Sequence, residues 1–162
     1  MTAFRYTGRL RRSRRTWAGL SSFERLKVAQ AVVLLPTVAV ANRIFGFMRV
    51  QLLLAATTHE PRSDHGTLGV DEVATVVAMV EIAAHRGVFR ANCLHRSMVT
   101  WWILRRRGVD TIIRFGVRPS AGGQRPDFHA WVERDGLVLN DHPKIADEFF
   151  PFDGPVGRSS WS

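Results

Sequence analysis

The spacing of apolar residues changes near Gly108, and this change limits the folds open to the chain more than any other feature. Before Gly108 the apolar positions recur at helical spacing, which predicts helices over 71–86 and about 92–107. After Gly108 they alternate, which predicts three strands over 111–118, 128–133 and 137–141. Helices followed by a small antiparallel sheet predict an α+β fold.

The first third of the chain carries further apolar segments of helical spacing. Ser21 or Ser22 can cap a helix that begins at Phe23, and Pro36 is expected to kink or end it. A second helix is predicted over 37–56. Its apolar stripe consists of Val40, Ile44, Phe47, Val50, Leu53 and Leu54. We interpret this stripe either as a face that packs against the core or as a docking surface for a partner protein.

A length of 162 residues suits one domain. We divide it into a basic arm, a helical region, a loop and a core, with the bounds 1–20, 21–57, 58–69 and 70–162. The 23 basic and 14 acidic residues give a net charge of +9, but six arginines precede Trp17, which leaves 17 basic and 14 acidic residues for the remainder. Because the charge gathers in the arm, without a groove-reading helix or a stacking platform, nucleic-acid binding is not expected.

Cysteine usage and apolar runs bear on the compartment. The single cysteine, Cys93, excludes an internal disulfide and a zinc site built on cysteine pairs, so a reducing cytoplasm is expected. The apolar tract 29–41 and an arginine pair in the arm resemble an export signal, but Glu24 and other charges separate them, and export is not expected. A membrane contact is not expected either, because Pro36 and Arg43 interrupt the apolar run before the roughly 20 residues of a span.

Cys93 lies at the start of the helix predicted over 92–107. Backbone N–H groups are unpaired there and the helix dipole is positive, which lowers a thiol pKa and favours a nucleophilic thiolate. The Cys93 N–H can also donate to an oxyanion. The side chain of Asn92 is interpreted either as a second oxyanion donor or only as the helix cap.

A hairpin supplies a candidate base and its partner. A three-residue loop over 134–136, with Gly in its last position, is a known hairpin type. With that loop His129 lies directly opposite Asp141, so the carboxylate can orient the imidazole toward Cys93. A two-residue turn would instead pair His129 with His142 and turn Asp141 to the other face. The three-residue loop therefore predicts a Cys-His-Asp triad.

Two further side chains, Ser97 and Trp131, are candidates for lining an oxyanion or substrate site. Ser97 lies one helical turn beyond Cys93, and Trp131 shares a strand face with His129. Core packing is the simpler interpretation of Ser97, and Trp131 is either a wall of the site or a core residue. His142 is an alternative base, and a metal site combining it with the three triad residues is a further alternative. Neither a metal nor a cofactor is expected.

Four segments form a recognisable combination. They are Asn92-Cys93-Leu94-His95-Arg96-Ser97, the helix end Leu104-Arg105-Arg106-Arg107-Gly108, the strand Arg114-Phe115-Gly116-Val117-Arg118, and His129-Ala130-Trp131-Val132-Glu133 followed by Asp141. Together, over about residues 70–142, they resemble the lasso-peptide leader peptidases of the transglutaminase-like superfamily. The resemblance implies a papain-like cysteine-protease core.

The resemblance also implies a function, the removal of the leader from a ribosomally made lasso-peptide precursor. Cys93 would attack the carbonyl at the junction of leader and core, His129 would move the proton, and Asp141 would orient His129. The implied partners are the precursor leader, a small leader-recognition protein and a separate ATP-using lasso cyclase. We interpret the apolar helices before residue 57 as the docking surface for the recognition protein. Acyl transfer to an amine by the same triad and a non-catalytic scaffold are the alternatives.

Overall fold

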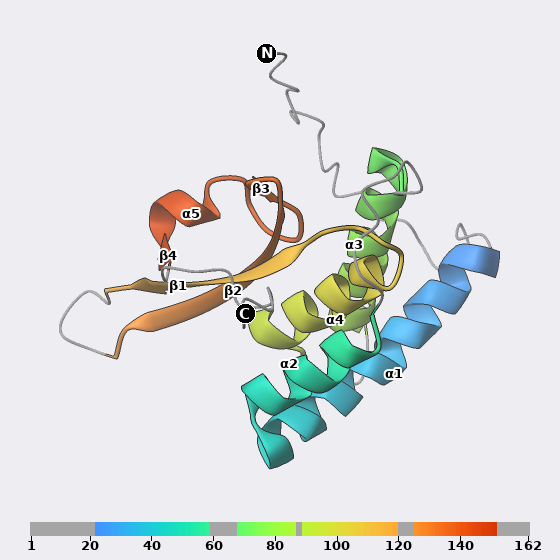
Figure 1. Cartoon of the computed structure of the whole chain (residues 1–162), viewed down its shortest axis with the longest axis horizontal. Coiled ribbons are helices and arrows are strands. Elements are labelled where there is room, and N and C mark those ends of the chain that lie inside the picture. The colour runs from blue at the N-terminus through green and yellow to red at the C-terminus, as the bar shows by residue number, and fades with distance from the viewer. Residues whose placement is uncertain (1–21, 59–67, 87–88, 120–124, 152–162) are drawn as a thin grey trace.

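The computed structural model of the chain describes residues 22–58, 68–86, 89–119 and 125–151, so the predicted basic arm and most of the predicted loop 58–69 lie outside the described residues. Within those ranges the helices α1 (Ser22–Phe45), α2 (Phe47–Ala56), α3 (Val70–Arg86) and α4 (Cys93–Arg105) come first. They are followed by β1 (Ile112–Arg118), β2 (Asp127–Arg134), β3 (Leu137–Val138), α5 (Ile145–Glu148) and β4 (Phe150–Pro151). This order confirms the predicted α+β architecture (Figure 1).

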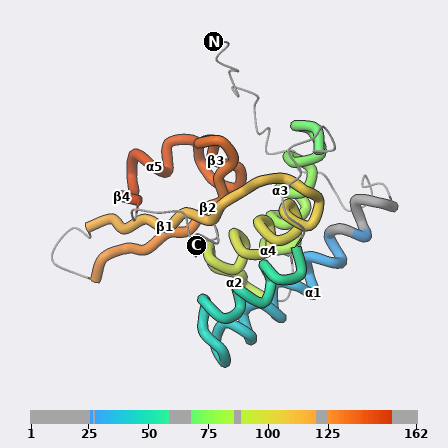
Figure 2. The backbone as a smooth tube through the Cα atoms, in the orientation of Figure 1, coloured from blue at the N-terminus to red at the C-terminus, as the bar shows by residue number. Residues whose placement is uncertain are grey.

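Two layers of side chains cover the sheet. The strands are antiparallel in the order β3-β2-β1-β4, with α1 to α4 on one side and the segment between β3 and β4, which contains α5, on the other (Figure 2). Buried side chains of α1, α3 and α4 form the main core together with Ile113 and Val132 of the sheet. A smaller cluster of Trp131, Ile145 and Phe149 covers the other face. Successive residues of a strand point to opposite faces, so β2 contributes Val132 to one cluster and Trp131 to the other.

Gly116 on β1 allows the smaller cluster to lie close to the sheet. A Cβ atom at this position would lie 2.7 Å from the Cβ of Phe149 and 2.9 Å from the ring of Trp131, too close for either to stay in place. Gly116 is also the residue of β1 that pairs with His129 on β2. The missing side chain therefore leaves room for the aromatic rings beside His129.

The break between the N-terminal helices lies at Gly46 and not at Pro36, where the sequence analysis placed it. α1 continues through Pro36 to Phe45. Gly46 separates the helices with a φ of +80° and a ψ of 155°, a conformation that only glycine adopts readily. Pro36 removes one backbone hydrogen bond, but Leu35 and Val38 beside it are buried in the main core, and this packing keeps the helix continuous.

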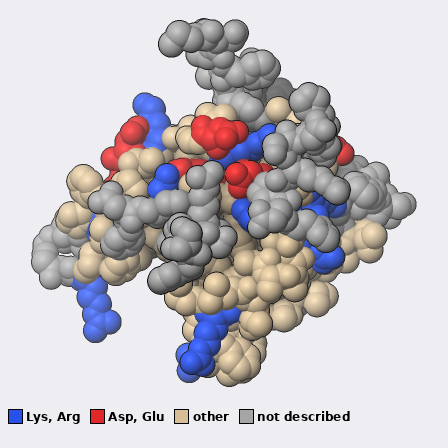
Figure 3. All heavy atoms as spheres, viewed as in Figure 1, with Lys and Arg blue, Asp and Glu red and all other residues tan. Residues whose placement is uncertain are grey.

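The predicted apolar stripe of residues 40–54 is not a single core face. Val50 and Leu53 both lie on α2, where Val50 is buried and Leu53 is exposed. Val40 and Ile44 are exposed because α1 turns another side toward the core. The buried apolar residues of α1 are Val28, Ala31, Leu35 and Val38. We use the name apolar face for the large exposed apolar residues of α1 and α2, which are Leu26, Val32, Val33, Val40, Ile44, Phe45, Met48, Leu52 and Leu53. The surface over these two helices is largely uncharged in Figure 3.

One window of α1 has the length and composition of a membrane span. The window Val28–Phe45 comprises 18 residues, of which 22% are buried. The core helix of a soluble protein and a signal sequence have the same two properties. Because the helix is continuous, the expected interruption of the apolar run at Pro36 does not shorten it.

The hairpin of β2 and β3 has a two-residue turn in place of the predicted three-residue loop. Arg134 pairs with Leu137 across Asp135 and Gly136, whose φ angles are 51° and 78°. Two successive residues with positive φ form the turn type whose twist matches that of antiparallel strands. The predicted register is therefore wrong, and the alternative register, which pairs residue 133 with 138, is observed.

Candidate active site

Cys93 is the first residue of α4 and is partly buried. Asn92 precedes it as the helix cap, and its Oδ1 accepts a hydrogen bond from the His95 N–H at 3.0 Å. The structure therefore shows that Asn92 is the helix cap, and donation from its Nδ2 to an oxyanion stays a prediction. The N–H of Cys93 lies in the first turn, where backbone donors have no acceptor within the helix, so it is available to an oxyanion.

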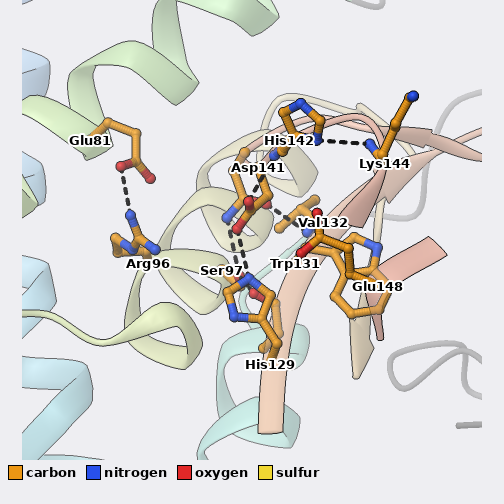
Figure 4. A network of polar contacts seen from close by, with 12 residues as sticks. Glu81, Arg96, Ser97, His129, Trp131, Val132, Asp141, His142, Lys144 and Glu148 are labelled. Carbon is orange, nitrogen blue, oxygen red and sulfur yellow. Dashed lines mark hydrogen bonds and ion pairs between the residues drawn. The ribbon is translucent and has the colours of Figure 1, made fainter. Parts of the chain in front are cut away.

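His129 lies on β2, and Asp141 lies in the turn after β3. His129 Nε2–H donates to Asp141 Oδ2 at 2.7 Å (Figure 4). The other carboxylate oxygen, Oδ1, accepts the backbone N–H of His142 at 2.7 Å. The imidazole is also hydrogen bonded to the thiol of Cys93. Because Nε2 is engaged by Asp141, Nδ1 is the ring nitrogen left for the thiol, and the three predicted side chains come together.

Asp141 reaches His129 in the observed register because the backbone leaves the strand ladder after Leu139. The Leu139 N–H still donates to the Val132 carbonyl at 2.9 Å. In a continued ladder the Val132 N–H would return a bond to Leu139, but it donates instead to Asn140 Oδ1 at 2.7 Å. The side chain of Asn140 thus replaces the backbone of a strand, and Asp141 turns toward His129.

The pKa of the Cys93 thiol reflects opposing effects. Partial burial raises this pKa, but hydrogen bonds from the His129 side chain and the Ala130 backbone lower it. The positive charge of His129 and the backbone N–H of Leu94 lower it further. The net result is a pKa below the ordinary value of 9.0, which increases the thiolate fraction at neutral pH.

The other two groups of the triad are shifted in the directions that maintain an ion pair. The hydrogen bond to Asp141, followed by the hydrogen bond to Cys93, raises the pKa of His129 from 6.5 to about 9 against the effect of burial. Burial raises the pKa of Asp141, but the hydrogen bonds from His129 and the His142 N–H outweigh it, and the pKa lies below 3.8. At neutral pH the imidazole is therefore protonated beside an ionised carboxylate.

Aromatic rings flank the imidazole of His129. Its centroid lies 5.1 Å from the ring of Phe149 and 6.2 Å from that of Trp131. Trp131 is fully buried, and its Nε1–H donates to Glu133 Oε1 at 2.7 Å. Trp131 therefore supports His129 from the interior, and the interpretation of Trp131 as a core residue replaces its predicted contact with substrate.

Ser97 is likewise fully buried, which is incompatible with the predicted contact with substrate. Its Oγ–H donates to the Ala130 carbonyl at 2.9 Å and its Oγ accepts from Asn140 Nδ2 at 3.0 Å. The sequence analysis did not identify Asn140. An asparagine at the end of a strand is an ordinary turn residue, and no sequence signal distinguishes this one.

The remaining polar groups near the triad have other contacts. Arg96 Nη1 donates to Glu81 Oε2 at 2.8 Å, away from the imidazole in Figure 4. His142, the alternative base, is exposed, and its Nδ1 accepts the backbone N–H of Lys144 at 3.2 Å. Within the described ranges, no group of three or more His, Cys, Asp or Glu side chains is arranged to hold a metal ion.

This arrangement has the groups that nucleophilic acyl transfer requires. A thiolate at the start of a helix can attack a carbonyl carbon, and the backbone N–H of Cys93 can stabilise the oxyanion that forms. A protonated imidazole next to the sulfur can then donate a proton to the leaving group. The rings of Trp131 and Phe149 and the carboxylate of Asp141 hold this imidazole in one orientation.

Comparison with known proteins identifies the superfamily of the chain. The chain is 33% identical over 73 residues to the microcin J25-processing protein McjB of Escherichia coli, a match that covers 44% of this chain and 33% of that protein. No solved structure matches the chain. The sequence profile of the transglutaminase-like superfamily matches residues 31–152, from within α1 to just beyond β4 and including all three side chains of the triad. The chain therefore belongs to the transglutaminase-like superfamily.

Proposed function

We propose that the protein is a cysteine endopeptidase that removes the leader from a lasso-peptide precursor. The observation that supports this most is the hydrogen-bonded chain from the Cys93 thiol through His129 to Asp141, with the thiol pKa lowered and the imidazole pKa raised. The similar protein from Escherichia coli is named for the processing of microcin J25. That name supports a precursor peptide as the substrate.

The reaction begins at the peptide bond between leader and core. The Cys93 thiolate attacks the carbonyl carbon, and the tetrahedral oxyanion accepts a hydrogen bond from the Cys93 N–H. His129 donates its proton to the nitrogen of the core as the peptide bond breaks, which leaves the leader on the sulfur as a thioester. His129 then removes a proton from water, the hydroxide attacks the thioester, and the leader is released as a carboxylate.

The apolar face of α1 and α2 is proposed as the docking surface for a leader-recognition protein. Its exposed apolar residues lie on the helices that also form part of the main core, so a partner bound there is held rigidly relative to α4 and Cys93. The released core peptide has a free amine, which a separate ATP-using cyclase would join to an acidic side chain. We place these steps in the cytoplasm.

The proposal is tested with the purified protein, its recognition protein and a precursor peptide, with the products weighed by mass spectrometry. Cys93→Ala and His129→Ala are expected to abolish cleavage, and Asp141→Asn to lower kcat by about 10³- to 10⁴-fold, because the imidazole loses its orientation and its charge partner. His142→Ala is the matched control, since this exposed neighbouring histidine is expected to be dispensable. Full cleavage by Cys93→Ala would refute the mechanism.

The same experiment distinguishes the alternative functions. An added primary amine that appears covalently on the leader would identify acyl transfer, because the thioester can be attacked by an amine as well as by water. Free leader and free core in equal amounts support the peptidase. No product with any precursor, and a Cys93 thiol of ordinary reactivity, would favour the scaffold.

A further inference from the structure

A small buried network of polar groups lies directly behind the triad. Asn140 Oδ1 accepts the Val132 N–H at 2.7 Å, and Asn140 Nδ2 donates to Ser97 Oγ at 3.0 Å. Ser97 Oγ–H in turn donates to the Ala130 carbonyl at 2.9 Å. Ser97 and Asn140 are both buried, so these hydrogen bonds form in a region of low dielectric, where an unmade bond is costly.

Three members of this network lie close in sequence to the three residues of the triad. Ser97 lies one helical turn beyond Cys93 on α4. Ala130 follows His129 on β2, and its backbone also bonds the thiol of Cys93. Asn140 directly precedes Asp141, whose carboxylate binds His129. The network therefore connects the helix, the strand and the turn that carry the three reacting groups.

Asn140 also determines which way the next residue points. In the observed two-residue register, a strand continued through residue 141 would place that side chain on the opposite face of the sheet from His129. The amide of Asn140 satisfies the Val132 N–H with a side-chain oxygen, so the backbone can leave the ladder without an unpaired donor. This departure is what brings Asp141 to 2.7 Å from His129.

We propose that Asn140, held by Ser97, is a positioning residue that sets the charge state of the Cys93–His129 pair through Asp141. This inference rests on the proposed function, in which that pair carries the reaction. Without Asn140, Asp141 no longer holds its hydrogen bond to His129, the imidazole loses its proton at lower pH, and the thiol titrates closer to an ordinary cysteine.

The test measures the rate at which iodoacetamide alkylates Cys93 as a function of pH, in the full chain. Cys93 is the single cysteine, so the label reports one site without any peptide substrate. For Asn140→Ala we expect the midpoint of the profile to rise by about one pH unit. At pH values below both midpoints alkylation should be about tenfold slower, because one pKa unit is a tenfold change in the thiolate equilibrium. Ser97→Ala is expected to shift the profile in the same direction by less.

Two control variants separate positioning from loss of stability. Val76→Ala removes core volume from α3, and Thr100→Val removes a buried hydroxyl of α4 that has no hydrogen-bond partner among the described residues. Both are expected to keep the wild-type profile. The double variant Asn140→Ala/Ser97→Ala is expected to shift no further than Asn140→Ala alone, because both residues act through one network.

The outcomes distinguish this inference from the proposed function. A wild-type midpoint in both Asn140→Ala and Ser97→Ala would overturn the inference alone, and an equal shift in Val76→Ala would overturn it as well. A lowered midpoint of Cys93 alkylation in the wild-type protein, without cleavage of any precursor, would count against the proposed function. The variants would still test the positioning role of Asn140. An ordinary thiol midpoint in the wild-type protein would overturn both. If Asn140→Ala does not fold, Ser97→Ala decides.

Discussion

At the scale of single residues, the reactivity of Cys93 depends on contacts that oppose its burial. Its position at the start of α4 was predicted to activate the thiol, but the His129 side chain and the Ala130 backbone lower its pKa more than the adjacent Leu94 N–H of the helix does. The raised pKa of His129 depends first on Asp141. The thiolate is therefore stabilised mainly by groups that are 36 or more residues away in the chain, and less by the helix that carries it.

The His129–Asp141 pair should make stability depend on pH. We compare Cys93→Ala with Cys93→Ala/Asp141→Asn, because both lack the thiol and its titration. The pKa of His129 is raised in the folded state, so its contribution is complete below 6.5 and is lost as the pH rises through the folded value. The pKa of Asp141 is lowered, so its contribution is complete above 3.8 and is lost as the pH falls.

The difference in unfolding free energy between the two variants is therefore expected to be largest from pH 3.8 to 6.5 and smaller on either side. Urea unfolding of both variants at about pH 3, 5.5 and 9, which lie below, within and above this window, measures this difference. A difference that does not change with pH would show that the pair is not ionic.

At the scale of elements, α1 shows how packing overrides a local signal. A proline in a helix interior removes a hydrogen bond and clashes with the preceding turn, which makes Pro36 the natural place to expect a break. The break occurs instead at Gly46, whose positive φ is disfavoured for other residues. Buried residues before and after Pro36 hold the helix together, as Leu35 and Val38 show.

Substitutions at these two positions are expected to have opposite effects on stability. Pro36→Ala restores a donor for the Val32 carbonyl and should raise the free energy of unfolding by about 1 to 3 kcal/mol. Gly46→Ala should lower it by about 1 to 2 kcal/mol through backbone strain alone, since no atom lies within 4 Å of the added Cβ. Chemical denaturation of both variants measures the effects. A loss of stability in Pro36→Ala would mean that the proline shapes α1 for its packing.

At the scale of the whole molecule, the apolar residues of α1 and α2 divide into two sets. One set completes the main core, and the other forms the exposed apolar face. Between Leu26 and Thr58 the only charged residues are Lys27, Arg43 and Arg49. This stretch of the chain therefore contains no acidic residue. Contiguous exposed apolar residues are a feature of interaction surfaces.

The apolar face is expected to cause association of the isolated chain. Substituting its exposed side chains with charged ones should prevent this association without unfolding the protein. Ile44→Glu combined with Leu53→Glu should change the free energy of unfolding by no more than about 0.5 kcal/mol each, because both side chains are exposed. Sedimentation velocity should show that the wild type associates and the variant does not, and the variant should lose binding to the recognition protein. Val38→Glu, at a buried position of the same helix, is the control that should unfold. Equal sedimentation and equal partner binding by wild type and variant would contradict the role of the face.

The sequence by itself determined the order of the four long helices and the first three strands, the start of α4 at Cys93 and the residue types of the triad, but it did not indicate α5 or β4. These depend on periodicity, on a capping asparagine and on side-chain chemistry, all of which are local. The superfamily could also be inferred from the combination of short segments. Only the tertiary structure decided the hairpin register and the exit of the chain at Asn140.

The reason is that these features depend on contacts between distant segments. Whether a turn over residues 134–136 contains two or three residues is decided by which strand face packs against α4, and the bond from Asn140 to Ser97 crosses 43 positions of sequence. The same holds for α1, where the side buried against α3 and α4 is set by the core and not by the stripe over 40–54. Local patterns specify the elements, whereas the faces that meet are chosen by the free energy of packing the whole core.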